Sequence, residues 1–151
     1  MIWKISKTVN KYLLDTTICS DLMKDNPIVR DRLDALLDSD DYFTIPIVYG
    51  EILYGIERLK SGRRKRNLSQ KANQLFSEIR CESIPKEGSK PYARLKRKAG
   101  QQSKTLADHD LWIAATALAL NAILVSSDSD FERVEGLLGL QVENWMTGHN
   151  L

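Results

Sequence analysis

The stretch Val9-Asn-Lys-Tyr-Leu-Leu-Asp-Thr-Thr-Ile18 decides the fold of this chain. Its apolar run Tyr-Leu-Leu is typical of a buried strand, and the Asp-Thr-Thr that follows is rich in residues that cap helices. We therefore interpret residues 9–14 as a strand that ends in an acidic turn at Asp15 and leads directly into a helix.

A second stretch, Ile123-Leu-Val-Ser-Ser-Asp128, repeats this order near the other end of the chain. Its unbroken apolar run is typical of a central strand in a parallel sheet. Between and beyond the two stretches, hydrophobic periodicity predicts helices over residues 26–37, 46–62, 67–79, 90–99 and 107–120, and short strands over residues 42–45, 81–84 and 140–143.

Strands that alternate with helices predict a three-layer α/β/α domain with a mainly parallel central sheet. The 151 residues, 42% of them hydrophobic, suffice for one substantial core, and we interpret residues 1–151 as a single domain. Ligands of such folds bind beyond the carboxyl ends of the strands. Asp15 and Asp128 each follow a strand pattern directly, so both are expected at that end of the sheet.

Charge and cysteine content narrow the classes of function. The 22 basic and 20 acidic side chains leave a net charge of only +2, so nucleic acid would have to be bound by local patches. Cys19 and Cys81 form no C-x-x-C spacing, which fits a reducing cytoplasm better than a disulfide framework. Residues 1–10 lack the apolar core of a signal peptide, so we expect a soluble cytoplasmic protein.

Four carboxylates stand after strands or near the starts of apolar helices: Asp15, Glu51, Asp110 and Asp128. Converging anions repel one another and resist burial, so a shared site would need a cation. Mg²⁺ or Mn²⁺ prefers oxygen ligands and bridges to phosphate. Such an ion can activate water for attack on a phosphodiester, and the sequence is compatible with one ion or two.

Each acid also has a structural interpretation. Asp15 could cap the helix after it, and Asp110 could complement the positive end of its helix dipole. Glu51 could be a solvated helix residue, and Asp128 could form a turn. The repeated placement at strand ends and helix starts favours a shared site over four separate roles.

Neighbouring polar residues are given lesser roles. The spacing from Thr105 to Asp108 matches a capping box, so we assign Asp108 to capping the helix. Asp130 is a weaker alternative to Asp128. His109 and His149 lack any zinc-ligand spacing and are interpreted as incidental to the site.

Ordered segments of the chain resemble the motifs of VapC-type toxins in the PIN-domain ribonuclease family. Residues 136–145 are similar to the final strand that is usual in the family. Residues 1–10 are a candidate extension before the family's first strand. The resembling segments are Tyr12-Leu-Leu-Asp-Thr16, Gly50-Glu-Ile-Leu-Tyr-Gly-Ile56, Asp110-Leu-Trp-Ile-Ala-Ala115 and Leu124-Val-Ser-Ser-Asp-Ser-Asp-Phe131.

The resemblance implies a PIN-like α/β/α fold and an endoribonuclease that uses Mg²⁺ or Mn²⁺. Its four acidic positions, catalytic and metal-binding, match Asp15, Glu51, Asp110 and Asp128. Thr16 and Ser126 would be polar neighbours that orient the acids.

The resemblance also implies partners. These are an RNA substrate, a second copy of the chain in a homodimer, and a cognate VapB-like antitoxin, which we expect to place an Arg or Lys among the carboxylates. Two basic clusters are either solvated helix faces or contacts for the RNA backbone. The candidate RNA-binding residues are Arg63, Arg64, Lys65, Arg66, Arg94 and Arg97.

Two other functions stay open. The chain could be an interaction module that keeps the PIN fold without turnover, and an assay with metal and chelator separates this from an enzyme. It could also be another acid-site phosphotransfer protein. However, Asp15-Thr-Thr17 has no second Asp two positions on, as a D-x-D phosphatase would, and residues 1–14 hold none of the acids that a receiver domain needs.

Overall fold

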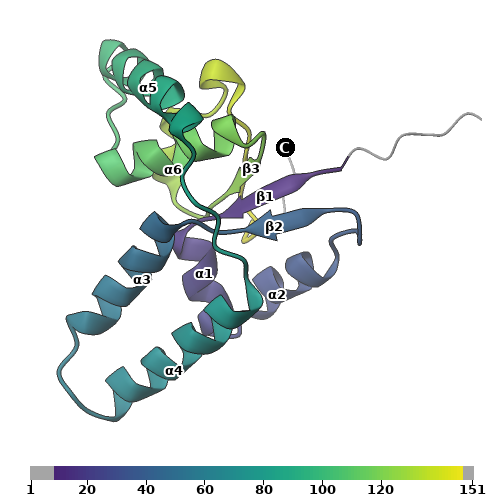
Figure 1. Ribbon diagram of the computed structural model, residues 1–151, viewed down its shortest axis with the longest axis vertical. Coiled ribbons are helices and arrows are strands. Elements are labelled where there is room, and N and C mark those ends of the chain that lie inside the picture. Colours follow the sequence, from purple (N-terminus) through teal and green to yellow (C-terminus); the bar gives the residue numbers. More distant parts are fainter. Residues whose placement is uncertain (1–8, 148–151) are drawn as a thin grey trace, which may run out of the picture.

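The computed structural model describes residues 9–147. Four strands within this range form one parallel sheet in the order β2-β1-β3-β4 (Figure 1). In its register, Leu13 pairs with Phe43 on one side and with Leu124 on the other, so β1 is central. The strands are β1 (Lys11–Leu14), β2 (Asp41–Phe43), β3 (Ile123–Val125) and β4 (Val142–Glu143).

Helices cover both faces of this sheet. In Figure 1, α5 and α6 lie on one side and α1, α2 and α4 on the other, which confirms the predicted three-layer α/β fold. No helix in the described part of the chain is long and apolar enough to cross a bilayer. The helices are α1 (Thr16–Met23), α2 (Pro27–Asp34), α3 (Pro46–Glu57), α4 (Arg63–Glu78), α5 (Ser89–Gln101) and α6 (Asp108–Ala119).

Three predicted helix boundaries and one predicted strand are wrong. The helix predicted over residues 26–37 ends at Asp34. The third helix ends at Glu57 rather than at residue 62, and α4 begins at Arg63 because the basic residues there are good helix formers. Residues 81–84 form no strand. Cys81 makes a single bridge to Thr44, since Pro85, which lacks an N–H group, soon ends the pairing.

The segment around this bridge covers the outer edge of β2. The Arg80 guanidinium donates to both carboxylate oxygens of Asp41 at 3.0 and 2.8 Å, and it also pairs with Glu82. Such a forked pair fixes both distance and orientation.

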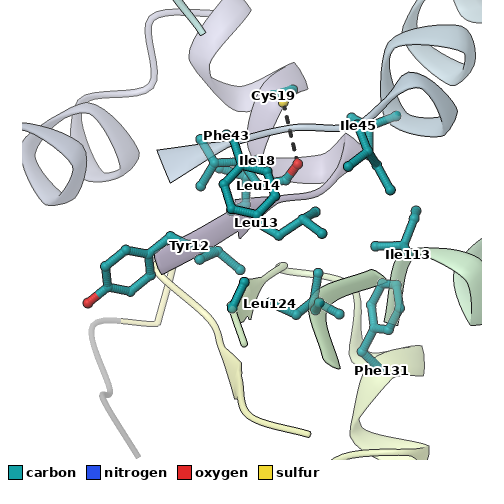
Figure 2. Packing of buried hydrophobic residues seen from close by; sticks show 14 of the residues in the cluster. Tyr12, Leu13, Leu14, Ile18, Cys19, Phe43, Ile45, Ile113, Leu124 and Phe131 are labelled. Atoms are coloured by element: carbon teal, nitrogen blue, oxygen red, sulfur yellow. Dashed lines mark hydrogen bonds between the residues drawn. The ribbon is translucent and has the colours of Figure 1, made fainter. Parts of the chain in front are cut away.

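The core packs around the carboxyl ends of the two central strands. Leu14 is fully buried, as are Ile18 of α1 and Leu124 of β3, and Ile113 of α6 lies nearby (Figure 2). The N–H of Asp15 continues the strand pairing by donating to the Val125 carbonyl at 3.1 Å. The backbone therefore holds the residues that follow β1 and β3 side by side.

Candidate functional site

Asp15 lies at the end of β1 and is only 2% exposed. Its Oδ1 accepts hydrogen bonds from the Ile18 N–H at 3.0 Å and from the Thr17 hydroxyl at 2.7 Å. Burial raises the pKa of this carboxyl to about 6, opposed by hydrogen bonds from Ser126 and Thr17. Asp15 therefore caps α1, and it also holds a buried charge that capping alone does not require.

Thr17 links the ends of the two central strands. Its hydroxyl donates to Asp15, accepts from the Ser127 N–H at 3.0 Å, and lies 3.5 Å from the Ser126 Oγ. The Ser126 Oγ accepts in turn from the Asp128 N–H at 3.0 Å. One chain of hydroxyl groups thus orients both Asp15 and the turn that carries Asp128. We call Asp15 and Asp128 the strand-end pair.

Glu51 and Asp110 come from α3 and α6, and we call them the helix pair. Glu51 accepts a hydrogen bond from the Thr16 hydroxyl at 2.8 Å. The His109 Nε2 lies 3.4 Å from Glu51 Oε2 and 3.5 Å from Asp110 Oδ1. The lack of zinc spacing predicts no role for His109, yet the structure places it between two acids of the site.

Electrostatic influence joins the two pairs. Burial is the largest cause of the raised pKa of Asp110, with His109 opposing it and Glu51, Asp128 and Asp130 adding to it. Asp128 also raises the pKa of Asp15. The four acids expected from the sequence are therefore linked in a series, from Asp15 through Asp128 and Asp110 to Glu51, although they come from four separate parts of the chain.

The donor set fits a hard divalent ion. Within residues 9–147, no three acidic, histidine or cysteine side chains are gathered closely enough to enclose an ion on their own. Mg²⁺ does not need such a cage, since it keeps several waters and binds through one or two carboxylates plus substrate phosphate. Carboxylate oxygens, without cysteine, also suit Mg²⁺ or Mn²⁺ better than zinc.

The assignment of Asp108 to a capping box is wrong. Ala107 precedes the first turn of α6 and no side chain caps it. The Asp108 carboxylate instead accepts hydrogen bonds from Lys96 and from the Tyr92 hydroxyl, both at 2.9 Å. Packing of α5 against α6 brings these partners to Asp108, and local spacing does not reveal this contact.

Asp130 lies beside the site without joining it directly. The N–H of Asp130 donates to Asp128 Oδ1 at 2.9 Å, and the Asp130 carboxylate pairs with Arg133 at 3.2 Å. His149 lies outside the described residues, as do residues 1–8 of the candidate extension.

A groove of about 920 Å³ opens beside the helix pair, between α1, α3 and α4. Thr16 and Glu51 form the end nearest the site, and Arg63, Arg64 and Lys71 supply positive charge along it. A polyanion in this groove would reach the acids between basic side chains, which offset their negative field.

The other candidate RNA-binding residues do not line this groove. Lys65 is drawn to Glu57, with a side-chain distance of 3.9 Å. Arg66 lies on α4 outside the groove lining, and Arg94 and Arg97 belong to α5.

Comparisons with known proteins identify the family of this chain. The family described as PIN domain matches residues 12–137. Ribonuclease VapC1 of Haemophilus influenzae is 31% identical over 89% of this chain and 97% of its own length. Ribonuclease VapC2 of Rickettsia felis is 29% identical over 89% of this chain and 97% of its own length.

Solved structures are similar over the same extent. The crystal structure of VapBC2 from Rickettsia felis bound to a DNA fragment from their promoter aligns with a TM-score of 0.78 at 26% identity, covering 89% of this chain and 98% of that one. VapBC-1 from nontypeable Haemophilus influenzae aligns with a TM-score of 0.77 at 26% identity, covering 90% and 98%.

Proposed function

The chain belongs to the PIN-domain family of VapC-type ribonucleases, and from this premise we propose that it cleaves RNA as a Mg²⁺- or Mn²⁺-dependent endoribonuclease toxin. The observation that carries the proposal is that the acids are held in two pairs. Hydroxyl groups link Asp15 to the turn of Asp128. His109 lies between Glu51 and Asp110. Such an arrangement is costly without a cation, because buried carboxylates of like charge disfavour one another's ionisation.

The four acids would hold the ion directly or through its bound waters. When bound, the ion would supply the positive charge that such a site needs to orient and activate water and to stabilise the charge that develops on the phosphate and leaving oxygen. Thr17 holds Asp15 through its hydroxyl, and Ser126 holds the Asp128 turn. Thr16 orients Glu51 in the same way.

The basic side chains would bind the RNA backbone. Arg63 and Arg64 line the groove that leads to the helix pair, so they support contacts close to the cleaved bond. Lys65, Arg66, Arg94 and Arg97 would act farther from it. Phosphate contacts of this kind add affinity without reading sequence.

We further propose that a VapB-like antitoxin inhibits the chain by placing an Arg or Lys among the carboxylates. The similar structures from Rickettsia felis and Haemophilus influenzae are VapBC complexes, which supports such a partner. A guanidinium can donate to two carboxylate oxygens at once. Inhibition is then expected to weaken as the Mg²⁺ concentration rises.

A homodimer is the remaining proposed partner. Leu53 and Tyr54 of α3 are 42% and 64% exposed, and this apolar surface supports contact with a second copy of the chain. Light scattering at micromolar concentrations checks the mass, and a monomer throughout would reject the dimer.

Cleavage of a labelled single-stranded RNA tests the enzymatic proposal. The parent chain should cut RNA with Mg²⁺ or Mn²⁺ and stop with chelator, and Asp110→Asn should remove this activity. Asp108→Asn is the matched control, since it changes a carboxylate two positions away that pairs with Lys96 instead. Absence of metal-dependent cleavage by the parent chain would favour an interaction module without turnover.

A further inference from the structure

A second cavity, which we call the distal pocket, lies between α5, the end of α6 and the short turn Leu137–Gly139. Its volume of about 530 Å³ is in the range of small-ligand sites. The rise of α6 places it roughly 15 Å from Asp110, at the opposite end of the helix. Six residues define its chemistry: Pro91, Arg94, Leu118, Asn121, Leu138 and Gln141.

Three polar side chains line this pocket. They are the Arg94 guanidinium and the Asn121 and Gln141 carboxamides, and none has a side-chain partner among residues 9–147. A carboxamide offers both a donor and an acceptor, which is what the edge of a nucleic-acid base requires. Pro91, Leu118 and Leu138 provide apolar surface beside them.

The backbone around the pocket is held in an uncommon conformation. Leu138 has φ 55°, in the left-handed region that bulky residues rarely adopt, whereas the φ of 53° at Asn121 is usual for an asparagine that follows a helix end. Leu138 also keeps 37% of its surface exposed. A strained, exposed leucine gains little from burial in the fold itself, and such outliers are typical of ligand sites.

A positive stripe runs along α5 beside the distal pocket. Lys90, Arg94, Arg97 and Lys98 recur at the spacing of one helix face along α5, and all are exposed without a charged partner in the described part of the chain. Lys96, in the middle of α5, lies on the other side of this helix and pairs with Asp108 at the start of α6. The stripe can therefore attract a phosphate backbone to the pocket through Arg94.

We propose that the distal pocket binds one unpaired nucleotide of the RNA substrate. Arg94 contacts its phosphate, Leu118 and Leu138 support the base, and the Asn121 and Gln141 carboxamides bond to the base edge. This inference rests on the proposed ribonuclease function and deepens it, because a base held here helps to select which RNA is cut. Single-stranded RNA is recognised in this way, through splayed bases bonded on their edges.

Binding of four labelled homopolymers, of A, C, G and U, to the full chain tests the proposal. Asp110→Asn is present in every sample so that the RNA stays intact. We expect Asn121→Ala with Gln141→Ala to weaken binding of the preferred homopolymer about tenfold and to reduce the differences among the four, since bonds to the base edge carry the discrimination among bases. Asn73→Ala, an exposed carboxamide of α4 outside the pocket, is the matched control.

Two further variants separate the parts of the pocket. Arg94→Ala should weaken the binding of all four homopolymers alike. It should also reduce the salt dependence of binding by about one phosphate contact. Leu138→Gly removes the apolar wall but suits the positive φ, so it should weaken binding without lowering the melting temperature.

The outcomes distinguish this inference from the function on which it rests. If the parent chain cleaves RNA with metal but the carboxamide variants bind all four homopolymers as Asn73→Ala does, the distal pocket is not a nucleotide site. If the parent chain cleaves nothing, the proposed function fails, whereas loss of binding in the carboxamide variants would still support the pocket.

Discussion

The strand-end pair and the helix pair are held in different ways. Asp15 is 2% exposed, its N–H is part of the strand pairing, and its carboxylate accepts two hydrogen bonds. The side chains of Glu51 and Asp110 are 32% and 16% exposed and are held mainly by other side chains. The strand ends therefore fix one half of the site, and the helices supply a half that can adjust.

The largest expected difference between the halves is in catalysis. Asp15→Asn should lower cleavage on the order of 100-fold or more, since metal-ion charge stabilisation is worth several kcal/mol. Added metal should not restore it. Glu51→Gln should lower the cleavage rate by a smaller factor. The rate should recover in part as the Mg²⁺ concentration is raised, because the helix pair can adjust. Cleavage rates of both variants, measured across a Mg²⁺ titration, check this prediction. If both variants lose the same activity and recover it equally, the two halves of the site are not held differently.

A smaller loss is expected at Thr17, which orients the fixed half without touching substrate. Thr17→Val keeps the shape but removes the bond to Asp15 and leaves the Ser127 N–H without its partner. We expect cleavage to fall roughly 10- to 100-fold, as for residues that orient metal ligands. Thr17→Ser restores the hydroxyl and should recover both the rate and the Mg²⁺ requirement. A purely structural role would instead lower the melting temperature with no change in that requirement.

The third expected effect is on stability in chelator. The pKa of Asp15 is raised from 3.8 to about 6, so the fold favours its protonated form. The stabilisation of the folded state by protonated Asp15 is fully present below about pH 4 and is lost as the pH rises through 6. Asp15→Asn, which removes the buried charge, should therefore stabilise the chain by about 2 to 3 kcal/mol at pH 8.

Thermal melts of the two proteins at pH 8 and pH 4 measure this difference. The gain should nearly vanish at pH 4. Asp110→Asn should act in the same direction, because burial also raises the pKa of Asp110. A variant at Asp15 that is less stable than the parent at pH 8 would show that capping, rather than charge burial, dominates at this position.

The sequence predicted the fixed half of the site better than the adjustable half. Asp15 and Asp128 each follow an apolar run, and parallel strands place such residues at one edge of the sheet. Thr17 carried a weak signal, as a hydroxyl two positions after a strand-end acid. Its contact with Ser127 depends on which strands are neighbours, and local spacing does not contain that information.

Contacts between helices were harder to foresee. The spacing from Thr105 to Asp108 matches a capping box, but packing against α5 gives Asp108 two partners that outcompete the cap. His109 precedes Asp110 in the sequence, yet only the approach of α3 places it beside Glu51. Both cases show tertiary packing overriding a local pattern.

The Arg80 clamp on Asp41 bears on how the chain behaves when it is crowded with copies of itself. Exposed sheet edges recruit strands from other molecules and lead to aggregation. Here β2 is only three residues long, Cys81 bridges to Thr44 directly after it, and Arg80 binds Asp41 within it. This edge of the sheet therefore resists the addition of a strand from another molecule, which leaves β4 as the edge at which strands could add.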